Sequence, residues 1–134
     1  MNILFTAPID FNKELKKKIK KDYKVKFAYK IPKRKLGKLL ENYEVLITNP
    51  GSNYKYDKRL LKKAKNLRYI ITPSTGTDHI DIDYCKSKKI KIRSLLNNRK
   101  ILNSITASAE FTLFLILYTL RKFNLVKKIT DDGS

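Results

Sequence analysis

Short apolar runs alternate with lysine-rich amphipathic segments along most of the chain. Five runs read as strands, at residues 3–6, 24–30, 45–47, 67–71 and 90–93. Between them, residues 12–21, 33–42, 57–64 and 82–88 repeat apolar side chains every three or four positions, which is typical of helices with one buried stripe. This alternation predicts an α/β fold, a doubly wound parallel sheet of five strands covered on both faces. The polar–apolar alternation of residues 24–30 predicts an edge strand.

The C-terminal part of the pattern is different. Residues 94–103 read as an irregular connection, and Ser104 or Thr106 is expected to cap a long final helix that ends near Asn124. Phe111–Leu120 is apolar nearly all round, although a surface helix needs only one apolar stripe. Each Leu or Phe left in water forgoes about 1.5–3 kcal/mol. We therefore expect another domain or another chain to cover this helix.

Targeting and membrane segments are not expected. The first ten residues lack a basic n-region and are too short for a signal sequence. Glu110 and Arg121 border the longest apolar stretch, which therefore falls short of a membrane span. Because the chain has one cysteine and one histidine, it can form neither an internal disulfide nor a Cys/His metal site. A reducing, cytoplasmic location fits this composition.

The formal net charge of +19 invites a polyanion or nucleic-acid function. The lysines are scattered over all predicted helices and greatly outnumber arginine, which favours solvated helix faces instead. We expect only non-specific, salt-sensitive binding to nucleic acid.

The candidate chemistry lies in turns that follow the strands. Ligands of such sheets bind beyond the carboxyl ends of the strands, where residues 7–8, 49–51 and 74–77 lie. The turn of residues 72–81 is rich in small polar residues and enters a short helix capped by Asp81. Its backbone N–H groups can hold an anion, with Gly76 admitting the ligand to the main chain. The alternative is an ordinary βα turn that holds nothing.

No residue in these turns is an evident catalyst. His79 is the one candidate general base, and its position favours a structural polar role on a short helix. Cys85, inside a predicted helix, is expected to be packed rather than reactive. We therefore expect a binding cleft without catalytic residues and without a metal.

Residues 67–81, which read Leu-Arg, an apolar run and then Gly76-Thr77-Asp78-His79-Ile80-Asp81, resemble a segment of the NAD-dependent D-2-hydroxyacid dehydrogenases. Residues 84–92 resemble the helix and strand that follow it in that family. Thr106–Thr112 with Arg121 resembles the family's "Ala-Glu-x-Thr … Arg" helix. The resemblance is close over residues 45–124 and lies only in the pattern over residues 1–43.

The resemblance implies a flavodoxin-like substrate domain, residues 1–103, joined to a Rossmann NAD-binding domain whose first helix lies in residues 104–134. It implies a carboxylate site on the main-chain amides of the turn, with the loop around Asn49 and Pro50 closing over the 2-hydroxy or 2-oxo acid. The substrate-binding candidates are Asn49, Pro50, Ser74, Thr75, Gly76 and Thr77. Thr75 and Thr106 are expected to contact NAD or NADP. The helix of residues 104–124 is expected to form a homodimer interface.

One departure from the family changes the expected function. The four glycines, at positions 37, 51, 76 and 133, cannot form the family's Gly-x-Gly-x-x-Gly motif, and no position matches its catalytic Arg, carboxylate and His. We therefore expect a truncated, substrate-side portion of the enzyme that is inactive alone and does not bind NAD tightly. A stand-alone flavodoxin-like interaction module is the alternative.

Overall fold

The computed structural model describes residues 1–132, which divide into two compact units. The first unit is residues 1–98, and the second begins at Arg99. The boundary between the two units lies after Asn98, whereas the sequence analysis expected a domain boundary after Asn103. Each unit is described by itself.

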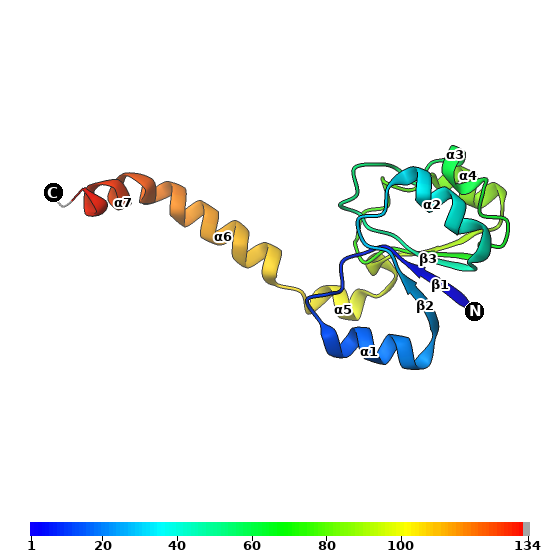
Figure 1. Ribbon diagram of the computed structural model, residues 1–134. Coiled ribbons are helices and arrows are strands. Elements are labelled where there is room, and N and C mark those ends of the chain that lie inside the picture. The colour runs from blue at the N-terminus through cyan, green and yellow to red at the C-terminus, as the bar shows by residue number, and fades with distance from the viewer. Residues whose placement is uncertain (133–134) are drawn as a thin grey trace. The chain divides into compact units, whose positions relative to one another are not determined.

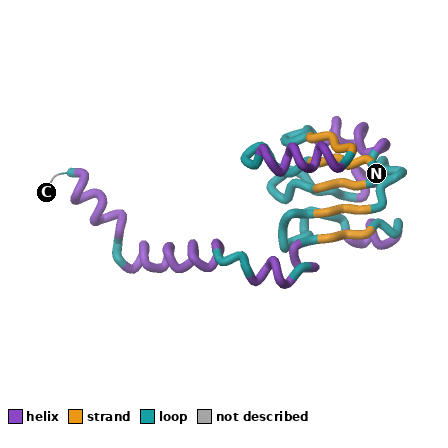
Figure 2. Tube along the Cα trace, turned by 90° about the horizontal axis from the view of Figure 1, so that it is seen from below, coloured by secondary structure: helices purple, strands orange, loops and turns teal. Residues whose placement is uncertain are grey.

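The first unit contains one five-stranded parallel sheet with the order β2-β1-β3-β4-β5 (Figure 2). Its strands are β1 (Asn2–Phe5), β2 (Lys24–Phe27), β3 (Val45–Ile47), β4 (Tyr69–Ile71) and β5 (Lys91–Arg93). This is the flavodoxin-like order, and the direction of winding reverses between β1 and β3. The predicted fold class is confirmed, and β2 lies at an edge as its alternating pattern predicted.

Short helices connect the strands. They are α1 (Lys13–Asp22), α2 (Lys33–Leu39) with the 3-10 turn η1 (Leu40–Asn42), α3 (Lys58–Leu61) and α4 (Ile82–Ser87), and the 3-10 turn η2 (Leu95–Asn97) follows the last strand. α2, α3 and α4 lie on one face of the sheet and α1 lies on the other (Figure 1).

Side-chain caps begin three of these helices. Asn12, Asp57 and Asp81 each accept a hydrogen bond from the backbone N–H three residues later, at 2.9, 2.8 and 2.9 Å. Asp57 and Asp81 therefore cap helices as predicted. The helix after Asp57 ends at Leu61 rather than at the expected Ala64.

The hydrophobic core lies between the sheet and the α2–α4 layer. Leu4, Leu46 and Ile70 project into it from β1, β3 and β4 and are fully buried. Because side chains alternate across a strand, the flanking residues of the same strands face the opposite side.

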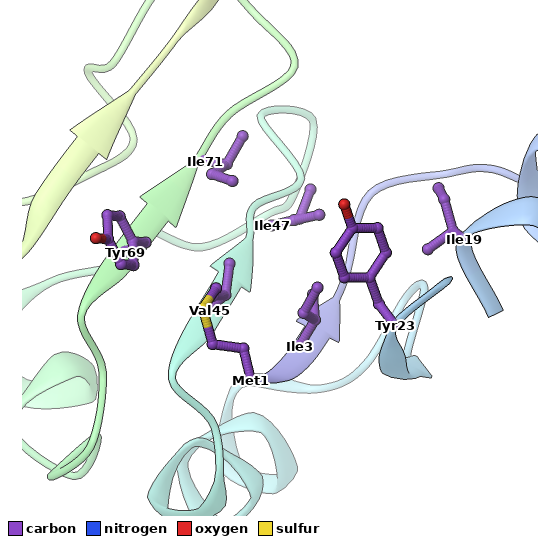
Figure 3. A pocket seen from close by; sticks show the side chains of 8 residues that line it. All are labelled: Met1, Ile3, Ile19, Tyr23, Val45, Ile47, Tyr69 and Ile71. Atoms are coloured by element: carbon purple, nitrogen blue, oxygen red, sulfur yellow. The ribbon is translucent and has the colours of Figure 1, made fainter. Parts of the chain in front are cut away.

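That opposite side is only partly covered. An apolar groove of about 400 Å³ runs along it, with side chains from the three central strands in its floor (Figure 3). The groove, called the open sheet face below, is lined by Met1, Ile3, Ile19, Tyr23, Val45, Ile47, Tyr69 and Ile71. α1 and its C-cap supply Ile19 and Tyr23, but Ile71 remains 37% exposed. Within the first unit, α1 therefore covers this face less completely than α2, α3 and α4 cover the other.

The second unit consists of α5 (Arg99–Asn103), α6 (Ala107–Leu120) and α7 (Phe123–Asp131). Two predictions are corrected here. Residues 94–103 are not irregular, because η2 and α5 occupy most of them. The expected single helix to Asn124 breaks at Lys122, whose left-handed backbone (φ 47°) cannot continue a right-handed helix.

The apolar side chains of α6 are exposed on all sides within the described residues. No residue of α6 is buried, and Leu120 is 73% exposed. The segment Arg99–Leu120 is long and apolar enough to cross a membrane by length and composition alone, contrary to the expected shortfall. One such helix is weak support for a span, because core helices of soluble proteins meet the same criterion.

Candidate functional site

Three threonines stand in a row at the carboxyl edge of the sheet. Thr6, Thr48 and Thr72 each follow the last residue of β1, β3 and β4, and all three are buried. Their N–H groups extend the parallel ladder, since each donates to the neighbouring strand at 2.9 Å. Three hydroxyl groups are thereby placed side by side beneath the turns where the sequence predicted a ligand.

Thr6, at one end of this row, is hydrogen-bonded to Tyr56. The Thr6 hydroxyl donates to the carbonyl of Ile47 at 2.7 Å and lies 3.0 Å from the Tyr56 hydroxyl. Because the single Thr6 proton is already used, Tyr56 donates in that second contact. The Tyr56 oxygen also accepts from the backbone N–H of Asn49 at 3.0 Å, which fixes the start of the turn after β3.

Thr48 and Thr72, the other two residues of the row, both contact His79. Its Nε2 atom lies 3.1 Å from the Thr48 hydroxyl and 3.2 Å from the Thr72 hydroxyl, and its ring packs edge-on against Tyr56. Burial lowers the pKa of His79, and the nearby charge of Asp78 opposes this shift only in part. The structural role predicted for His79 is confirmed, although it lies in the turn before α4 and not on a helix.

Two anchored carbonyls orient the turn of residues Ser74–Thr77, called the amide turn below. The Ser74 carbonyl accepts from the backbone N–H of Leu95 at 3.0 Å, and the Gly76 carbonyl accepts from the Ser74 hydroxyl at 2.8 Å. A trans peptide points its C=O and the next N–H in opposite directions. The N–H groups of Thr75 and Thr77 are therefore aimed away from the atoms that hold these carbonyls.

The amide turn keeps its donors available. Among residues 1–132, no protein acceptor takes the N–H of any of its four residues. Thr75 and Gly76 are exposed, while Ser74 and Thr77 are half-buried. Unpaired N–H groups at a surface turn can bind an anion, as the sequence predicted for this segment.

One acidic side chain opposes an anion here. Asp78 lies so close that a Cβ atom added to Gly76 would be 3.0 Å from its Oδ1 atom. An anion approaching the amide turn therefore meets the charge of this carboxylate, which is exposed and free to rotate toward solvent.

A hollow of about 370 Å³ lies near the turn after β3, at the switch point of the sheet. It is lined by Thr6, Tyr29, Lys30, Ile31, Pro32, Asn49, Gly51, Ser52, Asn53 and Tyr54. Asn49 thus lies where a ligand is expected, and its side chain accepts from the Gly51 N–H at 3.1 Å. Pro50 is exposed and does not line the hollow.

The remaining predicted cofactor contact belongs to the second unit. Thr106 is the N-cap residue of α6, but its hydroxyl donates to the Glu110 carboxylate rather than capping the helix. Neither Thr75 nor Thr106 lies in a glycine-rich dinucleotide turn.

The sequence interpretation missed Thr6, Thr48, Thr72 and Tyr56. A signal existed for the threonines, because each follows the last apolar residue of a predicted strand, as in Phe5-Thr6, Ile47-Thr48 and Ile71-Thr72. Nothing in the sequence marks Tyr56 as the partner of Thr6, fifty residues away.

Residues 1–132 place no evident reactive group at the candidate site. Among the described residues, no cluster of three metal-ligating side chains occurs. Burial raises the pKa of the Cys85 thiol to about 11, so this cysteine is packed and unreactive, as predicted. The arrangement provides exposed amide donors over a neutral, buried hydrogen-bond network.

Comparison with known proteins identifies the family. The catalytic-domain model of the D-isomer specific 2-hydroxyacid dehydrogenases matches residues 3–97. This chain belongs to that family. The match spans nearly all of the first unit, so the threonine row and the amide turn lie within the catalytic domain of a D-isomer specific 2-hydroxyacid dehydrogenase.

Individual relatives agree with this assignment. The chain is 30% identical over 90 residues to the formate dehydrogenase of Candida boidinii, covering 66% of this chain and 23% of that protein. It is 32% identical over 88 residues to the mitochondrial formate dehydrogenase 2 of Oryza sativa, covering 66% and 22%. The structure of D-lactate dehydrogenase from Aquifex aeolicus with NAD and lactic acid superposes with a TM-score of 0.74 at 26% identity, covering 98% of this chain and 37% of that one.

Proposed function

We propose that this chain is the substrate-side portion of an NAD-dependent oxidoreductase that moves hydride between NAD(H) and a D-2-hydroxy acid or 2-oxo acid. In the complete enzyme, NAD supplies or accepts the hydride. The part played by residues 1–98 is to bind the carboxylate of the acid at the amide turn. The observation that supports this most directly is the pair of anchored carbonyls, which aims the N–H groups of Thr75 and Thr77 outward.

A carboxylate is the ligand that suits this turn best. Backbone N–H groups bind carboxylate oxygens through charge-assisted hydrogen bonds without needing a cationic side chain. Asn49, in the hollow after β3, offers an amide donor for a second polar group of the acid, and Pro50 follows it in the same exposed loop. Both turns are tied to one buried network, since Thr48 precedes Asn49 and contacts His79.

Catalysis requires residues that this chain does not contain. Hydride transfer needs cofactor and substrate held in register, and the 134 residues include neither a Gly-x-Gly-x-x-Gly turn nor positions that match the family's catalytic Arg, carboxylate and His. The chain also spans only 23% of the Candida boidinii relative. We infer that residues 1–134 are inactive alone and that a nucleotide-binding domain completes the site.

Two apolar surfaces support this need for further protein. In the first unit α1 covers the open sheet face only in part, and in the second unit no residue of α6 is buried. We infer that α6 belongs to the nucleotide-binding domain and takes part in a homodimer interface. Coverage of 98% of this chain by the Aquifex aeolicus superposition supports a domain helix rather than a membrane span.

A titration followed by backbone amide NMR tests carboxylate binding. Pyruvate should shift the resonances of Thr75 and Thr77 more than any others, while its uncharged amide, pyruvamide, should not. If the largest shifts fell elsewhere, for example in the basic α2–α3 region, the assignment of the site would be overturned. A titration with formate tests the second substrate class, which the two formate dehydrogenase relatives favour.

A turnover assay tests the incomplete active site. The purified chain should not oxidise NADH with pyruvate, and activity should appear when an NAD-binding domain of the same family is supplied in trans. Turnover by the chain alone would refute our inference. If the chain instead bound DNA tightly and with little dependence on salt, the polyanion alternative would replace this proposal.

A further inference from the structure

We propose that His79 is a positioning residue for the amide turn, and that its Nε2 proton begins a one-way series of hydrogen bonds ending at the Gly76 carbonyl. The inference rests on the proposed function, because it concerns how the carboxylate-binding amides are held. It assigns His79 no contact with the substrate.

The direction of the series follows from counting protons, starting at its exposed end. The Ser74 hydroxyl has one proton, and it donates that proton to the Gly76 carbonyl at 2.8 Å. In the 2.7 Å contact between the Ser74 and Thr72 hydroxyls, Ser74 must therefore accept and Thr72 must donate. Each hydroxyl along the series has then used its single proton.

The same count fixes the protonation of the imidazole. Since the Thr72 proton goes to Ser74, the 3.2 Å contact between Thr72 and His79 needs a proton on Nε2. The Thr48 hydroxyl, 3.1 Å from the same nitrogen, is directed toward the Ile71 carbonyl at 3.4 Å and can accept as well. Neutral His79 is thus the Nε2–H tautomer, whose proton is shared by the two threonines.

The Gly76 carbonyl, at the end of the series, sets the direction of the Thr77 N–H that would bind the substrate. Because the peptide between Gly76 and Thr77 is planar and trans, holding the Gly76 carbonyl toward Ser74 turns the Thr77 N–H the opposite way. If the series is cut, this peptide loses its anchor and is free to rotate. The Thr77 N–H then no longer has a fixed direction, and binding a carboxylate must order the turn first.

The buried position of His79 makes it suited to this role. It is 7% exposed, its backbone carbonyl accepts from the Tyr56 N–H at 2.8 Å, and its ring packs against the Tyr56 ring. The imidazole is therefore held by the backbone hydrogen bond from Tyr56, by the packing of the two rings and by the contacts of its Nε2 atom. A donor fixed in this way gives the Thr72 hydroxyl one preferred rotamer and passes that preference to Ser74.

Two ligand-free measurements test the series in the full chain. A nitrogen-detected NMR spectrum of the imidazole should place the proton on Nε2, and a proton on Nδ1 in the neutral form would overturn the proposal. Ser74→Ala should lower the NMR order parameter of the Thr77 amide from about 0.85 to below about 0.6, while the order parameters in β3 stay unchanged. Equal Thr77 order parameters in the two proteins would also overturn it.

Pyruvate titrations then test the effect on binding. His79→Phe and Ser74→Ala should weaken pyruvate binding by about tenfold. His79→Gln, whose side-chain amide can donate from a position similar to Nε2, should restore most of the affinity. Ile90→Val, which removes one buried methyl group away from the turn, controls for loss of stability.

The outcomes separate the two proposals. If the unmodified chain does not bind pyruvate at the amide turn, the proposed function fails, while the imidazole spectrum and the order parameters still decide the hydrogen-bond series. If the unmodified chain binds and the variants at His79 and Ser74 bind equally well, the proposed function stands and the positioning role of His79 is refuted. If His79→Phe does not fold, Ser74→Ala alone decides, because its half-buried side chain is not part of the core.

Discussion

The hydroxyl oxygen of Thr48 lies 3.1 Å from the Nε2 atom of His79, and this contact joins the turn after β3 to the turn after β4. The two residues are 31 positions apart in the chain. Their contact links the two candidate ligand-binding turns through one buried hydrogen-bond network. A substitution in either turn is therefore expected to alter the conformation of the other.

The stability of the chain should depend on pH through His79. Burial lowers its folded-state pKa below the unfolded value of about 6.5, so the unfolded state binds more protons at mildly acid pH. The free energy of unfolding should therefore fall as the pH drops through about 6.5 and continue to fall until the folded-state pKa is reached. Urea denaturation between about pH 7.5 and pH 5.5 measures this slope.

The control for that experiment is His79→Gln, which keeps a donor but does not titrate in this range. His79 is the single histidine of the chain, so the variant should lose most of the slope over the same interval. An unchanged slope would show that another group controls the acid sensitivity.

Removing the charge of Asp78 should strengthen carboxylate binding. Its Oδ1 atom lies beside Gly76, and two like charges about 4 Å apart in water repel by about 1 kcal/mol. Asp78→Asn is therefore expected to bind pyruvate roughly threefold to fivefold more tightly, and added salt should reduce the difference. Asp83→Asn, an exposed change on α4, serves as the charge-matched control, and equal gains in both variants would indicate only a general field effect.

The same substitution should cost much more stability at one residue of β4 than at its neighbour. Ile70 is fully buried under the α2–α4 layer, whereas Ile71 lies on the open sheet face. Ile70→Thr should cost about 2–4 kcal/mol, because it removes a buried methyl group and buries a hydroxyl. Ile71→Thr should cost less than about 1 kcal/mol in the isolated chain and reduce its binding of hydrophobic dyes. A large loss of stability in Ile71→Thr would mean that this face is already covered.

The cap at α3 should matter more than the ion pair attached to it. Asp57 accepts from the Leu60 N–H at 2.8 Å and from Lys33 Nζ at 2.7 Å, and the Lys33 bond is the main reason its pKa is lowered. Asp57→Ala should cost about 1 kcal/mol through the lost cap, while Asp57→Asn should retain most of it. Lys33→Met should cost less than about 1 kcal/mol, because both side chains are 39% exposed and water screens the pair. Urea denaturation of the three variants at neutral pH provides the comparison.

Self-association should depend on the apolar surface of α6. Phe114 and Leu117 are about half exposed, and we expect the chain to form dimers or larger species through this helix. Leu117→Glu should shift sedimentation toward the monomer, whereas Thr112→Glu, on the same exposed helix, should have a smaller effect. Transfer of the unmodified chain into lipid vesicles without self-association would favour a membrane role instead.

The sequence alone was sufficient for the architecture of the first unit, because its information is local and periodic. Apolar runs predict the strands, and the side chains of Asp57 and Asp81 cap the N-termini of α3 and α4. The alternation of residues 24–30 was enough to place β2 at an edge. Local chemistry failed at Lys122, where a residue that ordinarily favours helices adopts a left-handed conformation and divides α6 from α7.

The site was decided by contacts between segments that are distant in the chain. The sequence identified the amide turn as a possible anion site, but its spacing alone favoured an ordinary βα turn. Only the tertiary structure brings Thr48 and Thr72 to the two sides of one imidazole nitrogen and leaves the turn's N–H groups without an acceptor among residues 1–132. The physical reason is that parallel pairing aligns the ends of β3 and β4, and the direction of a hydrogen bond depends on which partners that alignment supplies.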